Sequence, residues 1–304
     1  MSRQALAVAQ WVREQQLWMP GETVAMAVSG GADSLAMAAL LMASAGVHGG
    51  VLSVVTVDHQ QHPESAAVCQ RVLAWARSCG LEAQCLTLEL RTGQSEGALR
   101  SARYAAFEAL SVDRIALGHH QDDQVETALM AWLRGHGTRG AAGMPVRRGR
   151  FVRPVLHLES RVLRAYAEAQ ALPVHEDPAN DDPAFLRNRV RHQLVPLLER
   201  LRPGATGAVA RAALRAAEDE QVFEPMVQRA LMEHEASGGL PRDWVAEGPR
   251  AVVRRTLIAW TGDGQSGAVD AILAAAQRGS GVIQLTNDRR VVVSHATVAM
   301  VRDG

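Results

Sequence analysis

The chain has 304 residues, of which 47% are hydrophobic and 21% are charged, and its formal net charge is zero. This length is sufficient for a full hydrophobic core and favours two domains. No apolar stretch approaches the roughly 18 to 20 residues that a membrane helix needs, and the N-terminus lacks the basic and apolar regions of a signal peptide. We therefore expect a cytoplasmic protein with no membrane partner.

Cysteine and lysine usage restrict the chemistry further. Cys69, Cys79 and Cys85 form neither a C-x-x-C pair nor a metal-binding spacing, which favours reduced thiols. All 32 basic residues are arginine, so a Walker lysine and a lysyl-enzyme intermediate are excluded. Residues 134–202 contain 13 arginines against 7 acidic residues, and this local excess predicts contact with a polyanion such as nucleic acid.

Short apolar strands alternate with helical patterns through the first two thirds of the chain. We predict strands at residues 23–28, 51–57, 82–88, 114–118 and 151–156. Helices are predicted between them, at roughly 33–45, 63–79, 96–110, 122–134 and 160–170. This alternation predicts an α/β fold, a Rossmann-like parallel sheet with helices on both faces. Ligands of such sheets bind at the carboxyl ends of the strands, so the loops after the strands should converge on one site.

The sequence changes character after Pro203 and Gly204. Residues 208–236 are helical by period and by alanine content. Residues 281–301 form two β-rich runs around an Asn-Asp turn, which predicts a hairpin. We therefore predict two domains, at 1–202 and 203–304, the second smaller and mainly helical.

The segment SGGADS, at residues 29–34, lies between a predicted strand and a predicted helix. Backbone N–H groups at such a turn bind anions, and Gly30 and Gly31 let the backbone approach a phosphate. The carboxylate of Asp33 would repel a phosphate unless a divalent ion lay between them, which indicates Mg²⁺. The alternative is a tight turn in which Asp33 only caps the helix.

A second motif, GHHQDDQVETALMAWLRGHGTRGAAGMP, spans residues 118–145. Asp122 and Glu126 are four residues apart and share one helix face, with Asp123 beside them. Three acids at a helix N-terminus favour a metal or cation site, whereas the alternative is that the aspartates only cap the helix. The two histidines, His119 and His120, either orient these acids or bind metal.

Arginine-rich segments form the third group of candidates. Arg187, Arg189 and Arg191 alternate within EDPANDDPAFLRNRVRHQLVPLLE, at residues 176–199. They contact phosphates or form a solvated surface. Arg100 and Arg103 are three residues apart on one predicted helix face, where Arg100 either reaches the phosphates or an activated base or belongs to an ordinary surface pair.

These motifs resemble those of a known family. The segment 29–34 resembles the PP-loop of the N-type ATP pyrophosphatases. Segments 95–110, 118–145 and 176–199 resemble the motifs of the tRNA(Ile)-lysidine synthetases in their short form, although Ala179 and Ala141 stand where the family usually has Ser and Leu. The resemblance implies a PP-loop ATP pyrophosphatase domain at 1–202 and a tRNA-binding domain at 203–304, with a homodimer as one oligomeric state.

The resemblance also implies an activity. ATP adenylates the C2 oxygen of the wobble cytidine in the tRNA(Ile) with a CAU anticodon, with release of pyrophosphate. Free L-lysine then attacks carbon 2 through its ε-amine, AMP leaves, and lysidine is formed. The implied cofactors are ATP and Mg²⁺, and the nucleophilic amine must be unprotonated when it attacks.

Functional residues follow by position. The ATP-binding residues implied are Ser29, Gly30, Gly31, Ala32, Asp33, Ser34, Asp58 and His59. Catalytic roles fall to Asp33, Arg100, Asp122 and Asp123, with metal at Asp33 and Asp122. Lysine-binding residues are Asp123 and Glu126, and tRNA-binding residues are Arg134, Arg139, Arg153, Arg187 and Arg191. Which carboxylate accepts the proton of the amine is left open.

Three rival functions use parts of the same pattern. A PP-loop tRNA thiolase shares the loop but needs persulfide chemistry at a cysteine, and Cys69 and Cys79 lie on a predicted helix and its end, away from the strand-end loops. An amidotransferase-type ligase lacks its glutaminase domain here and leaves the arginines unexplained. A non-catalytic tRNA-binding module leaves the acids after the fourth strand unexplained. Lysidine formation is therefore the favoured function.

Overall fold

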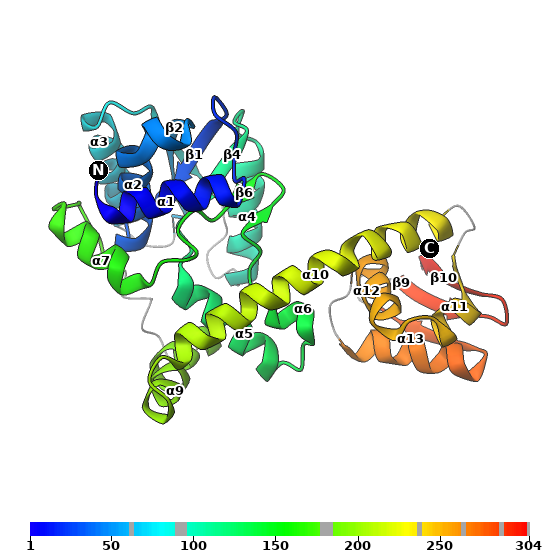
Figure 1. Cartoon of the computed structure of the whole chain (residues 1–304). Coiled ribbons are helices and arrows are strands. Elements are labelled where there is room, and N and C mark those ends of the chain that lie inside the picture. Colours follow the sequence, from blue (N-terminus) through cyan, green and yellow to red (C-terminus); the bar gives the residue numbers. More distant parts are fainter. Residues whose placement is uncertain are drawn as a thin grey trace. The chain divides into compact units, whose positions relative to one another are not determined.

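The computed structural model describes residues 1–60, 64–88, 96–176, 185–235, 239–262, 266–285 and 289–302 (Figure 1). The chain forms two compact units. The first contains Met1–Met130 and Gly143–Ala213, and the second contains Ala131–Ala142 and Leu214–Gly304. The segment 131–142 thus groups with residues far along the chain. The predicted division into a PP-loop domain at 1–202 and a tRNA-binding domain at 203–304 is a separate matter and stays a prediction.

A six-stranded sheet forms the centre of the first unit. Its strands lie in the order β3, β2, β1, β4, β6, β5. The bounds are β1 Thr23–Ala27, β2 Val51–Asp58, β3 Ala83–Thr87, β4 Arg114–Leu117, β5 Arg147–Arg148 and β6 Phe151–Val152. All neighbouring pairs are parallel except β5 with β6. This arrangement confirms the predicted fold class. The strand predicted at 151–156 ends after Val152, since the chain turns there and the N–H of Arg153 donates to the carbonyl of Val146.

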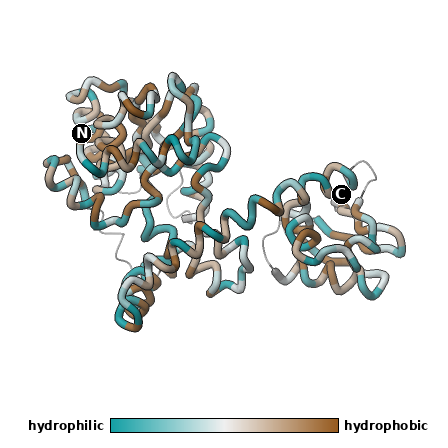
Figure 2. The backbone as a smooth tube through the Cα atoms, viewed as in Figure 1, coloured by the Kyte–Doolittle hydropathy of each residue, from teal (hydrophilic) through white to brown (hydrophobic). Residues whose placement is uncertain are grey.

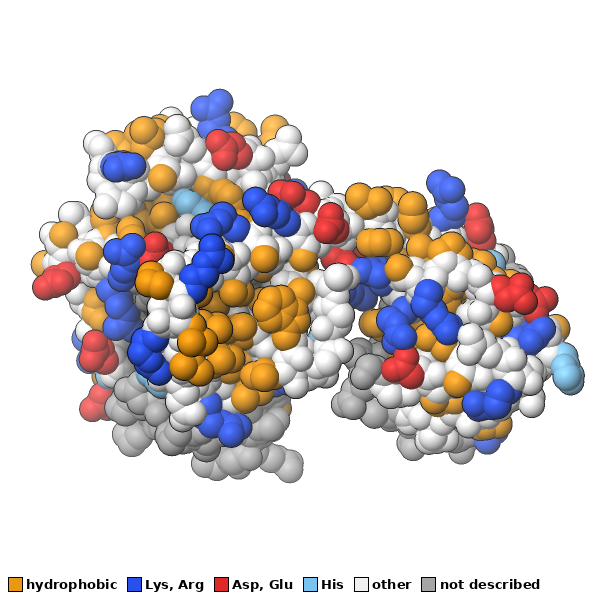
Figure 3. Space-filling model, turned by 60° about the horizontal axis from the view of Figure 1, so that its bottom comes forward, with side chains coloured by type: hydrophobic (Ala, Val, Ile, Leu, Met, Phe, Trp, Pro, Cys, Tyr) orange, Lys and Arg blue, Asp and Glu red, His pale blue; other side chains and the backbone are white. Residues whose placement is uncertain are grey.

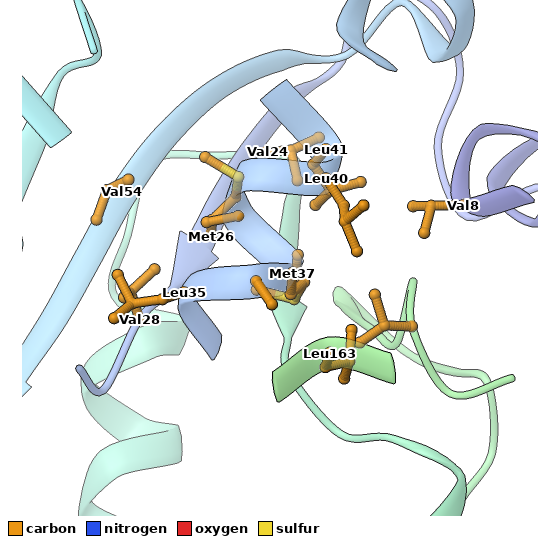
Figure 4. Packing of buried hydrophobic residues seen from close by; sticks show 14 of the residues in the cluster. Val8, Val24, Met26, Val28, Leu35, Met37, Leu40, Leu41, Val54 and Leu163 are labelled. Atoms are coloured by element: carbon orange, nitrogen blue, oxygen red, sulfur yellow. The ribbon is translucent and has the colours of Figure 1, made fainter. Parts of the chain in front are cut away.

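Alternate residues of the central strands point to opposite faces of this sheet. On one face Val24, Met26 and Val54 pack against helices α1 (Arg3–Glu14), α2 (Ala32–His48), α3 (Ser65–Ser78) and α7 (Ser160–Ala169). Figure 4 shows this packing, with Leu163 of α7 and Met37 of α2 directed toward the same cluster. On the other face Val55 and Ile115 pack against Phe107 of α4 (Glu96–Glu108). The central strands are correspondingly apolar in Figure 2.

Among the remaining helices of the first unit, the first lies between β4 and β5 in sequence and the others follow β6. They are α5 (Gln121–Leu133), α8 (Leu186–Arg189), the π-helical turn η2 (Val190–Leu194), α9 (Val195–Leu201) and the start of α10 (Ala205–Glu235). Val125 and Leu129 of α5 pack with Val190 and Ala210 in a small cluster of their own. This cluster fixes the arginine-rich segment around residue 190 against the helix that carries the predicted acids.

The second unit has its own core and sheet. Its elements are α6 (Thr138–Ala141), most of α10, β7 (Leu240–Pro241), α11 (Arg242–Glu247), α12 (Arg250–Thr261), α13 (Ser266–Arg278), β8 (Gly281–Gln284), β9 (Arg289–Val293) and β10 (Thr297–Arg302). The strands are antiparallel in the order β7, β10, β9, β8. The predicted hairpin is therefore part of a larger sheet. Its predicted Asn-Asp turn lies outside the described residues.

Candidate active site

The loop after β1 has the backbone geometry of an anion cradle. Gly30 has φ +90°, and a Cβ atom there would lie 2.6 Å from Cγ1 of Val68, so glycine is required on two counts. Helix α2 begins at Ala32 without a side-chain cap. The first N–H groups of a helix have no partner within it, so they remain to receive an anion. The hydroxyl of Ser34 donates to the carbonyl of Gly31 at 2.9 Å and closes the turn.

The end of β4 lies directly against this loop. A Cβ atom on Gly118 would be 3.0 Å from Cα of Ser34, so only a glycine permits this approach of the two segments without adjustment. Strands β1 and β4 are neighbours, and the chain order of the sheet reverses at β1. Sheets of this class bind ligands at that reversal. The predicted convergence of the segments 29–34 and 118–123 is observed.

His120 joins the acids of the two segments. Its Nε2 atom lies 3.5 Å from Oδ2 of Asp33 and 3.5 Å from Oδ2 of Asp123. Burial alone lowers the pKa of His120, but the hydrogen bond to Asp33 and the negative charges of Asp123, Asp33 and Asp122 outweigh it and raise the pKa to about 8. The raised pKa favours the imidazolium form, whose charge offsets part of the negative charge of the site.

Ser160, the first residue of α7, lies between the two predicted metal ligands. Its hydroxyl donates to Oδ1 of Asp33 at 3.0 Å, and its backbone N–H hydrogen-bonds to the carboxylate of Asp122. Burial raises the pKa of Asp122. The sequence pattern treated Ser160 only as the start of a helix, and nothing in its local sequence distinguishes it from other helix-starting serines.

Glu126 is buried in an ion pair. Its carboxylate accepts two hydrogen bonds from Arg191, at 2.6 Å from Nε and 3.1 Å from Nη2, and Arg187 lies 3.4 Å from it. Burial raises the pKa of Glu126, against the opposing effect of Arg191. Asp123 is also buried, but the charges of His120 and Arg187 hold its pKa below the usual value in spite of that burial. Ion pairs thus join Asp123, Glu126, Arg187 and Arg191 in one compact charge network.

Asp58 and His59, predicted to bind ATP, lie at the end of β2. Oδ1 of Asp58 accepts hydrogen bonds from the Ser65 hydroxyl at 2.6 Å and the Gln60 N–H at 2.9 Å. This carboxylate therefore closes the turn that leads to α3. Burial lowers the pKa of His59, and the positive charge of Arg103 adds to the effect. Arg100 is exposed on α4 and donates to the hydroxyl of Tyr104 at 3.4 Å.

The predicted tRNA-contacting arginines fall into three settings. Arg134 and Arg139 are exposed in the second unit. Arg187 and Arg191 are half-buried in the pairing with Glu126. Arg153 is only 2% exposed. Figure 3 shows arginine side chains beside apolar ones on the face that it draws.

The residues present fit a magnesium nucleotide. Among the described residues, no group of three His, Cys, Asp or Glu side chains forms a metal site by itself. Mg²⁺ usually takes only one or two carboxylates together with phosphate oxygens and water, and Asp33 and Asp122 provide two carboxylates around Ser160. The glycine-lined turn with its free helix N–H groups provides the phosphate cradle.

The fold and the cradle define a nucleotide-binding α/β protein of the PP-loop class. A family model described as a PP-loop domain matches residues 4–198. The chain is 35% identical to a tRNA(Ile)-lysidine synthase of Rhodococcus jostii, over 94% of this chain and 90% of that protein. It is 37% identical to the tRNA(Ile)-lysidine synthase of Geobacter sulfurreducens, over 80% of this chain but only 55% of that longer protein.

A solved structure supports the fold alone. The U34-tRNA thiolase NcsA of Methanococcus maripaludis superimposes with a TM-score of 0.58 at 20% identity, over 71% of this chain and 78% of the thiolase. The sequence relatives identify the family more narrowly than this structure does. The chain belongs to the tRNA(Ile)-lysidine synthase family of PP-loop proteins. The membership also agrees with the motifs, since two of the segments that carry the resemblance, 29–34 and the start of 118–145, meet at the ends of β1 and β4.

Proposed function

We propose that the chain forms lysidine at the wobble cytidine of the tRNA(Ile) with a CAU anticodon, using ATP and free L-lysine. The observation that carries this proposal is the junction at His120, whose Nε2 atom lies 3.5 Å from Asp33 and 3.5 Å from Asp123. A phosphate cradle and a set of carboxylates in one place serve both half-reactions. One half activates a base with ATP, and the other binds and deprotonates an amine.

In the first half-reaction the C2 oxygen of cytosine attacks the α-phosphorus of ATP, and pyrophosphate leaves. The segment 29–34 binds the polyphosphate through the first turn of α2. Asp33 and Asp122 would hold Mg²⁺, which would neutralise phosphate charge. We assign Arg100 of α4 to contact with the same substrates, and Asp58 and His59 to contact with the nucleotide. The cytidine must leave the anticodon stack to enter the site.

In the second half-reaction the ε-amine of lysine attacks carbon 2, the bond from carbon 2 to oxygen breaks, and AMP leaves. The amine loses a proton to a carboxylate. Because the pKa of a free lysine side chain is about 10.4, desolvation of the amine in the site must lower that value, against the neighbouring carboxylates, which raise it. Asp123 and Glu126 bind the amine. Arg191 pairs with both carboxylates, at 2.6 Å from Glu126 and 3.7 Å from Asp123.

The tRNA is bound by arginines, principally Arg134 and Arg139, which are exposed, and Arg187 and Arg191, which border the acids. No helix in the described part of the chain has the length and apolarity of a membrane span.

A tRNA thiolase is the second candidate. Burial raises the pKa of the Cys69 thiol to about 11, which disfavours the thiolate that sulfur transfer needs.

The direct test incubates the chain with ATP, Mg²⁺, radiolabelled lysine and an isoleucine tRNA with a CAU anticodon. Label in the tRNA is expected. A matched tRNA whose wobble cytidine is replaced by uridine should remain unlabelled. Incorporation of sulfur from a persulfide donor, with no lysine transfer, would assign the thiolase function instead.

A further inference from the structure

Arg153 differs from the other predicted tRNA contacts because its guanidinium is directed into the protein. It follows β6 directly, and its Nη1 atom donates to the carbonyl of Pro145 at 2.6 Å. Its Nε atom donates to Nδ1 of His119 at 3.2 Å. The Arg153 side chain thereby links the loop before β5 to the histidine at the end of β4.

The surroundings of Arg153 keep it in place. Tyr104 hydrogen-bonds to the guanidinium, and the ring of Tyr104 packs edge-on against Phe151 with a centroid distance of 4.7 Å. The backbone N–H of Arg153 donates to the carbonyl of Val146 at 3.0 Å. A guanidinium held by several internal partners at 2% exposure is not available to a nucleic-acid phosphate.

The bond to His119 determines where the imidazole carries its proton. A guanidinium has only donors, so Nδ1 of His119 must be the acceptor and cannot be protonated. Burial, together with the positive charges of Arg153, Arg100 and Arg103, lowers the pKa of His119 to about 3 against the opposing charge of Asp123. The ring is therefore neutral, and its one proton lies on Nε2.

We infer that Arg153 is a positioning residue that holds His119 as the neutral imidazole protonated on Nε2, so that His119 presents one fixed N–H donor in the candidate active site. The inference rests on the proposed function for the identity of the substrate group that accepts this hydrogen bond. The acceptor is an oxygen of the substrates, either of the phosphate or of the cytosine. A preorganised neutral donor gains strength where negative charge develops on such an oxygen.

The protonation state of His119 can be observed without activity. The full chain is labelled with ¹⁵N-histidine, and the His119 signals are identified by their absence in His119→Gln. At pH 7 we expect an unprotonated Nδ1 and a protonated Nε2. A proton on Nδ1 would overturn the inference. Because this spectrum needs no substrate, it separates failure of the inference from failure of lysidine formation.

Kinetics of Arg153→Met distinguish positioning from direct tRNA contact. We expect kcat to fall by about tenfold to a hundredfold, as when an outer partner of a site residue is lost, while the KM for tRNA stays unchanged. The slope of log Kd for tRNA against log salt should also stay unchanged, whereas a lost phosphate contact reduces it by about 1. A reduced slope with unchanged kcat contradicts the inference.

Two further variants complete the test. Lysine carries its donors on one terminal nitrogen and cannot place separate donors at the Nε and Nη1 positions that bond to His119 and Pro145. Arg153→Lys should therefore remain impaired; full activity would contradict the hydrogen-bonding role. In the His119→Gln background, Arg153→Met should cause no further loss of kcat, because its effect passes through His119. Additive losses would contradict that route. If Arg153→Met does not fold, the spectrum of the unmodified chain decides.

Discussion

The imidazole of His120 lies 3.5 Å from the carboxylate of Asp33, although the two residues come from different motifs. The same Nε2 atom lies 3.5 Å from Asp123. A single buried imidazole thus lies between the acid of the nucleotide loop and the acids of α5. This contact links the two segments, and we expect it to make the stability of this region depend on pH.

Replacing His120 by Asn should change how stability depends on pH. The folded pKa of about 8 exceeds the usual 6.5, so the folded state binds more protons between these values. The contribution of His120 to the free energy of unfolding is therefore complete below about pH 6.5 and is lost as pH rises through 8, by about 2 kcal/mol. Urea unfolding in Mg²⁺-free buffer should show this loss in the unmodified chain but not in His120→Asn.

His157 provides a control of opposite sign. Burial lowers its pKa to about 4, so the unfolded state binds more protons between pH 4 and 6.5 and stability rises with pH over that range. His157→Asn should remove this rise and leave the fall near pH 8 intact. If both variants altered the same pH range, the assignment of the two groups would be wrong.

Removing Arg191 should expose the cost of burying Glu126. Arg191→Met leaves a carboxylate that is 1% exposed without its bidentate partner, and breaking a buried pair in this way costs about 3 kcal/mol. The loss should be larger at pH 8 than at pH 5, because the raised pKa of Glu126 allows it to be protonated more readily at the lower pH. The double variant Glu126→Gln, Arg191→Met should recover much of the stability, and equal losses in both variants would contradict the pairing.

Gly30 and Gly31 are adjacent but should respond differently to alanine. Gly30→Ala combines φ +90° with a Cβ 2.6 Å from Val68, and strain of this kind costs about 1–3 kcal/mol. ATP binding should weaken because the loop must move. Gly31 has φ −75° and only an ordinary contact at 3.6 Å with Oγ of Ser29, so Gly31→Ala should leave the melting temperature nearly unchanged. Similar melting temperatures for the two variants would argue against this loop geometry.

In the second unit, Glu220 and Arg255 should contribute measurably to stability. Arg255 donates to Glu220 from Nε at 2.9 Å, and the Thr138 hydroxyl donates to the same carboxylate at 3.1 Å. The guanidinium also lies 4.0 Å from the centre of the Phe223 ring. Arg255→Gln should lower the free energy of unfolding of this unit by about 2 kcal/mol. The neighbouring Arg254–Asp270 pair is exposed, so Arg254→Gln should cost less than about 1 kcal/mol.

The sequence predicts most of the sheet because its strands are short apolar runs separated by helices, and the motif residues Gly30, Asp33 and Asp122 lie at the strand ends where the pattern places them. Its predictions are weaker where tertiary contacts decide. The sequence analysis does not predict helix α1, although Ser2 caps it by accepting from the Ala5 N–H at 3.1 Å and its buried residues recur at helical spacing. Burial of Arg153 depends on partners outside its local pattern, Pro145 in the preceding loop and His119, which is 34 residues away. An arginine in an arginine-rich segment is predicted from sequence to be exposed.

The central claim is that Asp33 and the acids of α5 act together in one ATP-using site. The most direct measurement is pyrophosphate release with ATP, Mg²⁺ and the CAU-anticodon tRNA, in the presence and absence of lysine. The unmodified chain should release pyrophosphate in both cases and form lysidine only with lysine. Asp33→Ala should bind the tRNA but release none, while the exposed control Asp270→Asn behaves normally. Unchanged pyrophosphate release by Asp33→Ala would contradict the account.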